Sequence, residues 1–403
     1  MLNNITHVRG FKCWGAHMGI KSKRRDIALI YSEVPATAAA VFTQNVFCAE
    51  PVKLSREHIK GGKAQAFIIN SGNANACTGE EGWKGAVAMA ETTAELLGIP
   101  KESVQVASTG LIGEPFPTEK VLDGIRECVK KLSDREMAGS LAANAILTTD
   151  TYAKEGFTSF DINGTNINMA GIAKGSGMIH PNMGTMLGFI TCDIAISQSL
   201  LDEALRSAVN KTFNMITVDG DTSTNDMVGI MCNGMAGNEK ITEKDKNYEK
   251  FYNNLEELCT HLAKLIVSDG EGSTKLIEYQ VRQAATEEKA RKIIRTVSDS
   301  SLVKTAVFGS DPNWGRIVGA AGRAGVSFDP DKLDLYIGSN AENSVQILKN
   351  GQPIKEARSE VKEAMKNSNI VIILDLNEGS VSATGWGPDL SYEYIRINAE
   401  YTT

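Results

Sequence analysis

The chain has 403 residues, of which 42% are hydrophobic and 23% charged, a composition typical of a globular protein with a substantial buried core. Its formal net charge of -7 comes from interspersed acids and bases, without the basic patch that nucleic-acid or anionic-membrane binding requires. No apolar run reaches the roughly 20 residues needed to cross a bilayer, and the start MLNNITHVRG lacks a signal-peptide layout. We therefore expect a cytoplasmic protein with small-molecule or protein partners.

Helical and strand-like segments alternate along the chain. Helical periodicity predicts helices over 83–97, 119–132, 134–147, 198–212, 247–267 and 286–295. Strand-like runs lie at 64–69, 104–108, 158–173, 186–196, 276–282, 333–337 and 370–375. Asn163-Gly164 and Asn350-Gly351 each sit between strand-like segments and predict hairpins, because both central positions of a type I′ turn need positive φ. The expected class is α/β or α+β with antiparallel pairs.

Two loop-like stretches indicate the borders of a smaller C-terminal α/β lobe, roughly residues 276–385. They surround Asp329 and Pro330 and run from Gly385 to Pro388. No low-complexity linker or internal repeat stands out.

Cysteine and histidine spacing argues against metal and disulfide chemistry. The seven cysteines are an odd number without a CxxC pair, so we interpret them as reduced packing residues. The five histidines form no HExxH motif and none lies beside a Gly-x-Ser-x-Gly elbow, which disfavours metal catalysis and a Ser-His-Asp triad. Asp219, Asp221 and Asp226 do not follow EF-hand spacing, and we interpret them as turn and hydrogen-bonding residues. No metal is expected.

The most unusual segment is Lys174 to Gly188, KGSGMIHPNMGTMLG, where a glycine-rich turn and a proline lead into an apolar run that begins at Thr185. If the bond before it were broken, a threonine at this position could use its own α-amine as a base. On its own, a Gly-Thr step before a strand is more often a turn followed by a β-branched strand residue. The residues alone leave both interpretations open.

The segment Lys174 to Leu187 closely resembles the self-cleavage segment of the ornithine acetyltransferases, also called glutamate N-acetyltransferases. Further segments resemble the same family in the same order: NSGNANACTG at 70–79, STGLIG at 108–113, TTDT at 148–151, VDGDTSTND at 218–226, SDGEGSTK at 268–275, SDPNWGR at 310–316 and the tail 398–403. One departure is Gly184, where many members have alanine. Glycine is equally small and more flexible, so we expect cleavage, at a rate that the sequence leaves open.

The resemblance implies a layered αββα sandwich, of the kind found in self-processing aminopeptidases, with the smaller C-terminal lobe. It also implies cleavage between Gly184 and Thr185 into an alpha chain, 1–184, and a beta chain, 185–403, with two of each in a heterotetramer. No cofactor is implied. Some members of the family also use acetyl-CoA as a co-substrate to make N-acetylglutamate. The sequence leaves open whether this chain has that second activity.

The implied reaction moves the acetyl group of N2-acetyl-L-ornithine to L-glutamate through an acetyl-Thr185 intermediate. By the same resemblance, the Thr109 hydroxyl and the Gly110 backbone N–H stabilise the oxyanion. The implied substrate-binding residues are Thr148, Lys174, Thr185, Glu271, Asn398 and Thr403. Chain ends are usually frayed, so a binding role for Asn398 and Thr403 requires the C-terminal tail to be held over the site.

Two other functions stay open. A self-processed aminopeptidase or amidase would let water resolve the acyl-enzyme, whereas the expected amino-acid pocket around Lys174 and Glu271 favours transfer. A non-catalytic binding protein would have lost cleavage, and the presence of Thr185, Thr109 and Gly110 together argues against it.

Overall fold

The computed structural model describes residues 4–180 and 186–400. Within these residues the strands form one sheet of eight strands and one of six. The larger sheet has the order β4-β3-β2-β8-β7-β6-β5, with β1 paired to β2. Its strands are β1 (Phe11–Ala16), β2 (Ile27–Phe42), β3 (Lys63–Asn73), β4 (Val104–Leu111), β5 (Lys154–Ile162), β6 (Thr165–Lys174), β7 (Leu187–Cys192) and β8 (Met227–Cys232).

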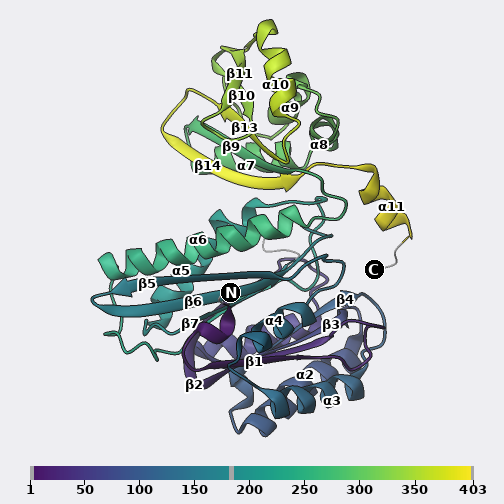
Figure 1. Ribbon diagram of the computed structural model, residues 1–403, viewed down its shortest axis with the longest axis vertical. Helices are drawn as coiled ribbons and strands as arrows, with labels where there is room; N and C mark the ends of the chain where they lie inside the picture. Colours follow the sequence, from purple (N-terminus) through teal and green to yellow (C-terminus); the bar gives the residue numbers. More distant parts are fainter. Residues whose placement is uncertain (1–3, 181–185, 401–403) are drawn as a thin grey trace.

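Helices cover both outer faces of this sheet (Figure 1). Figure 1 shows α2 and α3 below β1–β3, and α5 and α6 above β5–β7. The helices of the chain are α1 (Glu50–His58), α2 (Gly79–Leu97), α3 (Thr118–Lys131), α4 (Glu136–Ala145), α5 (Gln198–Lys211), α6 (Lys246–Ser268), α7 (Glu287–Ser298), α8 (Ser301–Phe308), α9 (Trp314–Gly322), α10 (Arg358–Ala364) and α11 (Tyr392–Glu400). Short 3-10 turns occur at Ile5–His7, Ile59–Gly61, Lys101–Ser103, Phe213–Met215, Pro330–Lys332 and Lys355–Ala357.

The long strand β2 lies between β3 and β8 and belongs to both layers into which the eight-stranded sheet folds. Its inner-face residues all belong to a single core between the two halves of the sheet: Ala28, Ile30, Ala36, Ala38 and Ala40. Its outer-face residues divide between two other cores, one with Ile27 and Leu29 and one with Ala39 and Val41. Across the inner core, Phe67 of β3 and Phe189 of β7 bring their ring centroids to 5.1 Å. The layers are therefore helix, sheet, sheet, helix, and the expected layered sandwich is confirmed.

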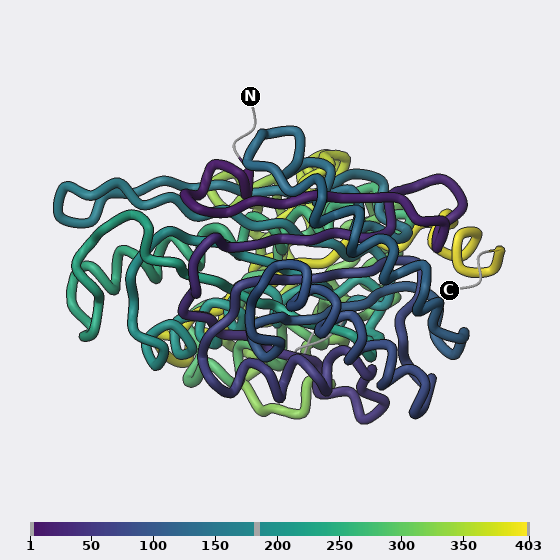
Figure 2. The backbone as a smooth tube through the Cα atoms, turned by 90° about the horizontal axis from the view of Figure 1, so that it is seen from below, coloured from purple at the N-terminus to yellow at the C-terminus, as the bar shows by residue number. Residues whose placement is uncertain are grey.

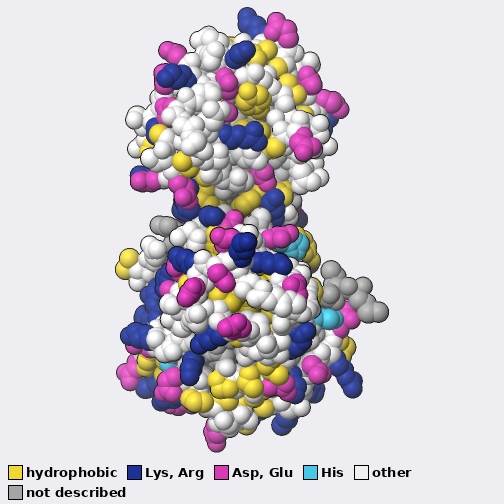
Figure 3. All heavy atoms as spheres, turned by 90° about the vertical axis from the view of Figure 1, so that its left-hand side faces the viewer, with side chains coloured by type: hydrophobic (Ala, Val, Ile, Leu, Met, Phe, Trp, Pro, Cys, Tyr) yellow, Lys and Arg dark blue, Asp and Glu magenta, His cyan; other side chains and the backbone are white. Residues whose placement is uncertain are grey.

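The six-stranded sheet belongs to residues 276–388 and has the order β12-β11-β10-β13-β9-β14. Its strands are β9 (Leu276–Ala284), β10 (Asp334–Gly338), β11 (Ser344–Lys349), β12 (Gln352–Pro353), β13 (Asn369–Asp375) and β14 (Val381–Pro388). Figure 3 shows this upper part joined to the sandwich through a narrower waist, with charges of both signs scattered over the face in view. Its hydrophobic core is nevertheless continuous with that of α5 and α6, so the two parts pack as one body.

One expectation about the lobe is wrong. Gly385 to Pro388 is the end of β14 and pairs with β9, and Asp329-Pro330 lies inside the lobe, just before β10. The glycine has a packing reason, since a Cβ on Gly385 would lie 2.6 Å from the carbonyl oxygen of Met215. Here glycine permits the close approach of another backbone and does not mark a loop.

Both predicted hairpin turns are confirmed. Asn163 and Gly164 have φ of 50° and 84°, and Asn350 and Gly351 have 47° and 72°, as a type I′ turn requires. The predicted run 158–173 is accordingly two strands, β5 and β6, paired antiparallel. Among the helices described, none is long and apolar enough to cross a membrane.

Candidate active site

A cavity of about 920 Å³ opens at one end of the sandwich. The carboxyl ends of β3, β4 and β6 reach it, together with the loop before β2 and the helix α11. Figure 2 shows that loop, in purple, and α11, in yellow, at the same end of the molecule. A cavity at strand ends between packed layers is where ligand sites commonly lie.

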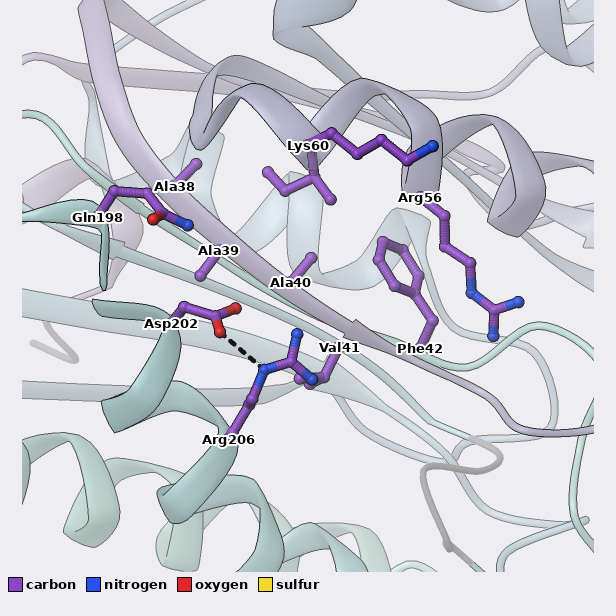
Figure 4. A pocket seen from close by; sticks show the side chains of 11 residues that line it. Ala38, Ala39, Ala40, Val41, Phe42, Arg56, Lys60, Gln198, Asp202 and Arg206 are labelled. Carbon is purple, nitrogen blue, oxygen red and sulfur yellow. Dashed lines mark hydrogen bonds and ion pairs between the residues drawn. The ribbon is translucent and has the colours of Figure 1, made fainter. Parts of the chain in front are cut away.

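A second, smaller hollow of about 480 Å³ lies along β2 between α1 and α5 (Figure 4). Figure 4 shows Ala38 to Phe42 along its floor and the ion pair of Arg206 with Asp202, at 2.8 Å. Of the predicted substrate-binding residues that the structure describes, none lines it. We therefore place the candidate site in the larger cavity.

The larger cavity brings together six residues that the sequence predicts for the site. They are Thr109, Gly110, Thr148, Lys174, Glu271 and Asn398. Gly184, Thr185 and Thr403 lie outside the described residues, so their places in the site stay predictions. The six come from five separate stretches of the chain, which the fold gathers around one volume.

Backbone pairing fixes the positions of the two predicted oxyanion donors, Thr109 and Gly110. β4 runs parallel to β3, with Thr109 beside Ser71 and Gly110 beside Gly72. Gly110 has φ of 135°, and a Cβ there would lie 2.3 Å from the carbonyl carbon of Gly72, so only glycine fits. Asn225 joins the two strand ends, because its Nδ2 donates to Ala74 O at 2.6 Å and to Ser108 O at 2.8 Å. The turn that carries the donors is therefore rigid.

Lys174, at the end of β6, contacts this turn. It is only 6% exposed, and its Nζ donates to Thr109 Oγ1 at 3.3 Å. Burial lowers the pKa of Lys174, and the nearby Asp150 acts in the opposite direction. Burial alone would raise the pKa of Asp150, but Lys174 and Lys154 outweigh it and hold that pKa well below its usual value. A buried cation and a buried carboxylate thus stabilise each other beside Thr109.

The acidic part of the cavity is built around Glu271, which follows α6. Asn398 Nδ2 donates to Glu271 Oε2 at 2.9 Å. A Cβ on Gly177 would lie 2.5 Å from the Glu271 carboxyl carbon, so the glycine-rich segment passes this carboxylate closely. The described part of the tail is attached as well, through Tyr394 O–H to Asp219 Oδ2 at 3.4 Å. The wall formed by α11 is thereby linked to both acids.

Other lining residues were not singled out by the sequence. The loop before β2 contributes Lys21, Lys23 and Arg24, and α11 contributes Tyr394 and Arg396. The run KSKRR in residues 21–25 is the one signal that pointed to this loop, and by itself it is typical of a solvated surface.

One of the acids that line the cavity has a structural role. Asp219 accepts from the backbone N–H groups of Met178 and Ile179, at 2.7 and 2.8 Å, and so holds the glycine-rich segment. In the part of the chain that the structure describes, no three His, Cys, Asp or Glu side chains gather to hold a metal ion. The seven cysteines are free thiols, and five of them are buried.

The chain is similar to proteins of one family along almost its whole length. A family model described as the ArgJ family matches residues 12–403. The arginine biosynthesis bifunctional protein ArgJ of Caldanaerobacter subterraneus subsp. tengcongensis is 50% identical over 395 residues, which cover 98% of this chain and 97% of that protein.

Two solved structures are also similar. One is the arginine biosynthesis bifunctional protein ArgJ from Bacillus halodurans, 44% identical with a TM-score of 0.44 over 45% of this chain and 94% of that one. The other is the ornithine acetyltransferase complexed with ornithine from Mycobacterium tuberculosis, 35% identical with a TM-score of 0.41 over 44% of this chain and 95% of that one. The family model and the full-length identity confirm the resemblance found in the motifs: the chain belongs to the ArgJ family.

Proposed function

We propose that this chain transfers the acetyl group of N2-acetyl-L-ornithine to L-glutamate, after cutting itself between Gly184 and Thr185. The observation that carries the proposal is the cavity in which Thr109 and Gly110, fitted to stabilise an oxyanion, lie with Lys174, Glu271 and Asn398, fitted to bind an amino acid. Membership of a family whose curated relatives are named for arginine biosynthesis supports it.

The first step of the proposal is self-cleavage. The Thr185 hydroxyl attacks the carbonyl carbon of Gly184, the amide nitrogen of Thr185 becomes the leaving amine, and water hydrolyses the resulting ester. Thr185 then carries a free α-amine, which serves as the base for its own hydroxyl. The neighbouring strand β7 begins at Leu187 and pairs with both β6 and β8, so the chain just after the nucleophile has a fixed anchor.

The second step is ping-pong acyl transfer. The Thr185 oxygen takes the acetyl group, ornithine leaves, and the amine of glutamate attacks the acetyl ester. In each tetrahedral intermediate, the oxyanion accepts hydrogen bonds from the Thr109 hydroxyl and the Gly110 N–H. Because Lys174 already donates to Thr109 Oγ1, the single proton of that hydroxyl is left for the oxyanion.

Amino-acid recognition follows from charge. Lys174 and the Thr148 hydroxyl suit an α-carboxylate, while Glu271 suits an ammonium group. Asn398 donates a hydrogen bond to the Glu271 carboxylate, and we propose Thr403 as a further binding residue. We further propose that two alpha and two beta fragments form the active assembly, which native mass spectrometry would measure directly.

The decisive experiment measures ornithine release from N-acetyl-L-ornithine with and without L-glutamate, with the products identified. Release that depends on glutamate and yields N-acetylglutamate supports the transferase. Release of acetate without glutamate means a hydrolase, and no release contradicts both. Replacing N-acetylornithine by acetyl-CoA in the same assay tests for the second activity that the word "bifunctional" in the relatives' names suggests.

The nucleophile has its own test. Thr185→Ala should remain a single full-length chain by intact-mass spectrometry and should release no ornithine, whereas the parent protein should give fragments 1–184 and 185–403. Normal two-fragment processing of the variant would refute the assignment of Thr185.

A further inference from the structure

The cavity has a cationic wall that the proposed roles do not use. In a chain with a net charge of -7, the loop between β1 and β2 places Lys21, Lys23 and Arg24 together along one side. The acids of the cavity come from other segments: Asp219, Asp221, Glu271 and Glu400. Lys174 and Arg396 add cations outside this loop. The loop is therefore the one lining segment that brings three cations and no acid to the described part of the cavity.

The proposed reaction needs such a separate cationic segment. Donor and acceptor both carry an α-carboxylate, but ornithine has a side-chain ammonium group and glutamate a side-chain carboxylate. A single side-chain subsite would repel one of them, since like charges in a partly desolvated site cost several kcal/mol. Two oppositely charged subsites beside one nucleophile remove the conflict.

The cationic loop is held in place by a buried carboxylate. Asp26, at the end of the loop, is fully buried and accepts from the backbone N–H groups of Met18 at 2.7 Å, Ile20 at 2.9 Å and Lys21 at 3.2 Å. His17 lies 3.2 Å from the same carboxylate. Three backbone bonds to one carboxylate fix the start of the Lys21 side chain before any substrate arrives.

The Lys21 side chain runs along the strand end that carries the oxyanion donors. A Cβ added to Gly72, the partner of Gly110, would lie 2.9 Å from Lys21 Cγ, so the lysine stem packs against that glycine. Lys21 Nζ donates to Leu147 O at 2.8 Å, which leaves two of its three N–H groups for a ligand. Arg24 lies beside it and donates to Asp150 O at 2.9 Å. The Lys21 side chain is thus half-buried and held in place, and its ammonium group still has N–H donors for a ligand.

We propose that Lys21, flanked by Arg24, binds the side-chain carboxylate of the acceptor glutamate, while the side-chain ammonium of the donor lies toward Glu271. The inference rests on the proposed function, since it assigns the two side chains of that reaction to different lining segments of the cavity. Lys21 is then a specificity-determining residue for the second half-reaction and not for the first.

The test separates the two half-reactions of the full-length, processed protein. Ornithine release in a single turnover without glutamate reports the first, and decay of the acetyl-enzyme with added L-glutamate or L-glutamine reports the second. In Lys21→Met, we expect the preference for glutamate over glutamine to fall roughly 10- to 100-fold, the range for a hydrogen bond to a charged group. The first half-reaction should stay within about twofold, since Lys21 comes from a different lining segment from Glu271 and has no part in the proposed binding of the donor.

Two variants serve as controls. Lys21→Arg keeps the cation and should restore most of the preference for glutamate. Lys101→Met removes the same charge from a surface lysine paired with Glu91 at 3.2 Å, and it should leave both half-reactions unchanged.

A structural role gives a different result. If Lys21 only held Leu147 and the neighbouring Thr148, the rates of both half-reactions would fall together in Lys21→Met. The rate with glutamate would then fall no more than the rate with glutamine, and this result would overturn the inference. Calorimetric titration with the two amino acids needs no turnover. If acetyl transfer fails in the parent protein, the proposed function falls, and the effect of Lys21→Met on glutamate and glutamine binding still decides the inference.

Discussion

The cavity has two walls that are built in different ways. The wall formed by the ends of β3, β4 and β6 rests on buried charged groups: Lys174 donates to Thr109 Oγ1, and the carboxylate of Asp150 accepts from Gly175 N–H and Lys154. The second wall is α11, which has no buried residue and is held by a few side-chain bonds such as Asn398 to Glu271. Transition-state stabilisation needs donors that do not reorganise, whereas a substrate must enter and leave. The difference predicts stability and kcat effects on the first wall and KM effects on the second.

The strongest way to break the first wall is to remove Lys154. Its Nζ lies 2.7 Å from Asp150 and 2.6 Å from Asp269, and the side chain is fully buried. In Lys154→Met the carboxylates of Asp150 and Asp269 lose the cation between them. We therefore expect the free energy of unfolding, measured by urea denaturation, to fall by roughly 3–5 kcal/mol. Lys211→Met, which breaks a surface pair with Glu256, should cost below about 1 kcal/mol. Equal losses in both variants would show that the buried network contributes no special stability.

Removing one proposed oxyanion donor should lower the rate and leave the fold intact. In Thr109→Ala we expect kcat to fall roughly 10²- to 10³-fold, the usual cost of one such donor, because the hydroxyl acts on the transition state. The KM for N-acetylornithine should change little, and thermal unfolding should match the parent protein. An increase in KM with unchanged kcat would instead make Thr109 a substrate-binding residue.

The sequence predicted the local features of the fold well. Asn-Gly turns and helical periodicity depend on near neighbours, and the structure confirms both hairpins and all six predicted helices, which are α2 to α7. The long strand β2 was missed because Pro35 interrupts its pattern, and the structure accommodates that proline where the register of β2 with β3 shifts. β14 was read partly as a loop because its glycines respond to contacts from another part of the chain.

The site was predicted unevenly for the same reason. Motifs identified residues such as Thr109 and Glu271, since a family resemblance carries them along with their surrounding segments. Lys154 carries no local signal, and the basic run around Lys21 is by itself typical of a solvated surface, because a lysine in a sequence is most often a solvated charge. The contacts that distinguish these two lysines come from residues far away in the sequence. Gly72 packs against the stem of Lys21, and Asp269 forms an ion pair with Lys154. Such contacts depend on the fold and not on the spacing of residues.

A third effect concerns pH and sharpens the role of the cationic loop. Burial, opposed by Asp26 and Asp150 and reinforced by Arg24 and Lys174, lowers the pKa of Lys21 to about 8. The lysine is charged below that pH and neutral above it. If it binds the glutamate side chain, the KM for glutamate should rise about tenfold between pH 7 and 9. Steady-state kinetics with varied glutamate measure this.

The pH experiment needs a control, since Lys174 has a lowered pKa and the α-amine of Thr185 would also titrate near this range. In Lys21→Arg the cation does not titrate, so the rise in KM should disappear while any change in kcat remains. A rise of the same size in this variant would assign the titration to another group.

The smallest effect belongs to the second wall. In Asn398→Ala the bond to Glu271 is lost from a half-exposed helix, and we expect the KM for N-acetylornithine to rise roughly fivefold, about 1 kcal/mol. Because α11 buries no side chain, the melting temperature and kcat should not change. Ile395→Ser, on the same helix but not lining the cavity, is the matched control and should leave all three quantities unaltered. A fall in kcat comparable to that of Thr109→Ala would mean that α11 orders the reacting groups, and the contrast between a rigid catalytic wall and a substrate-binding tail would not hold.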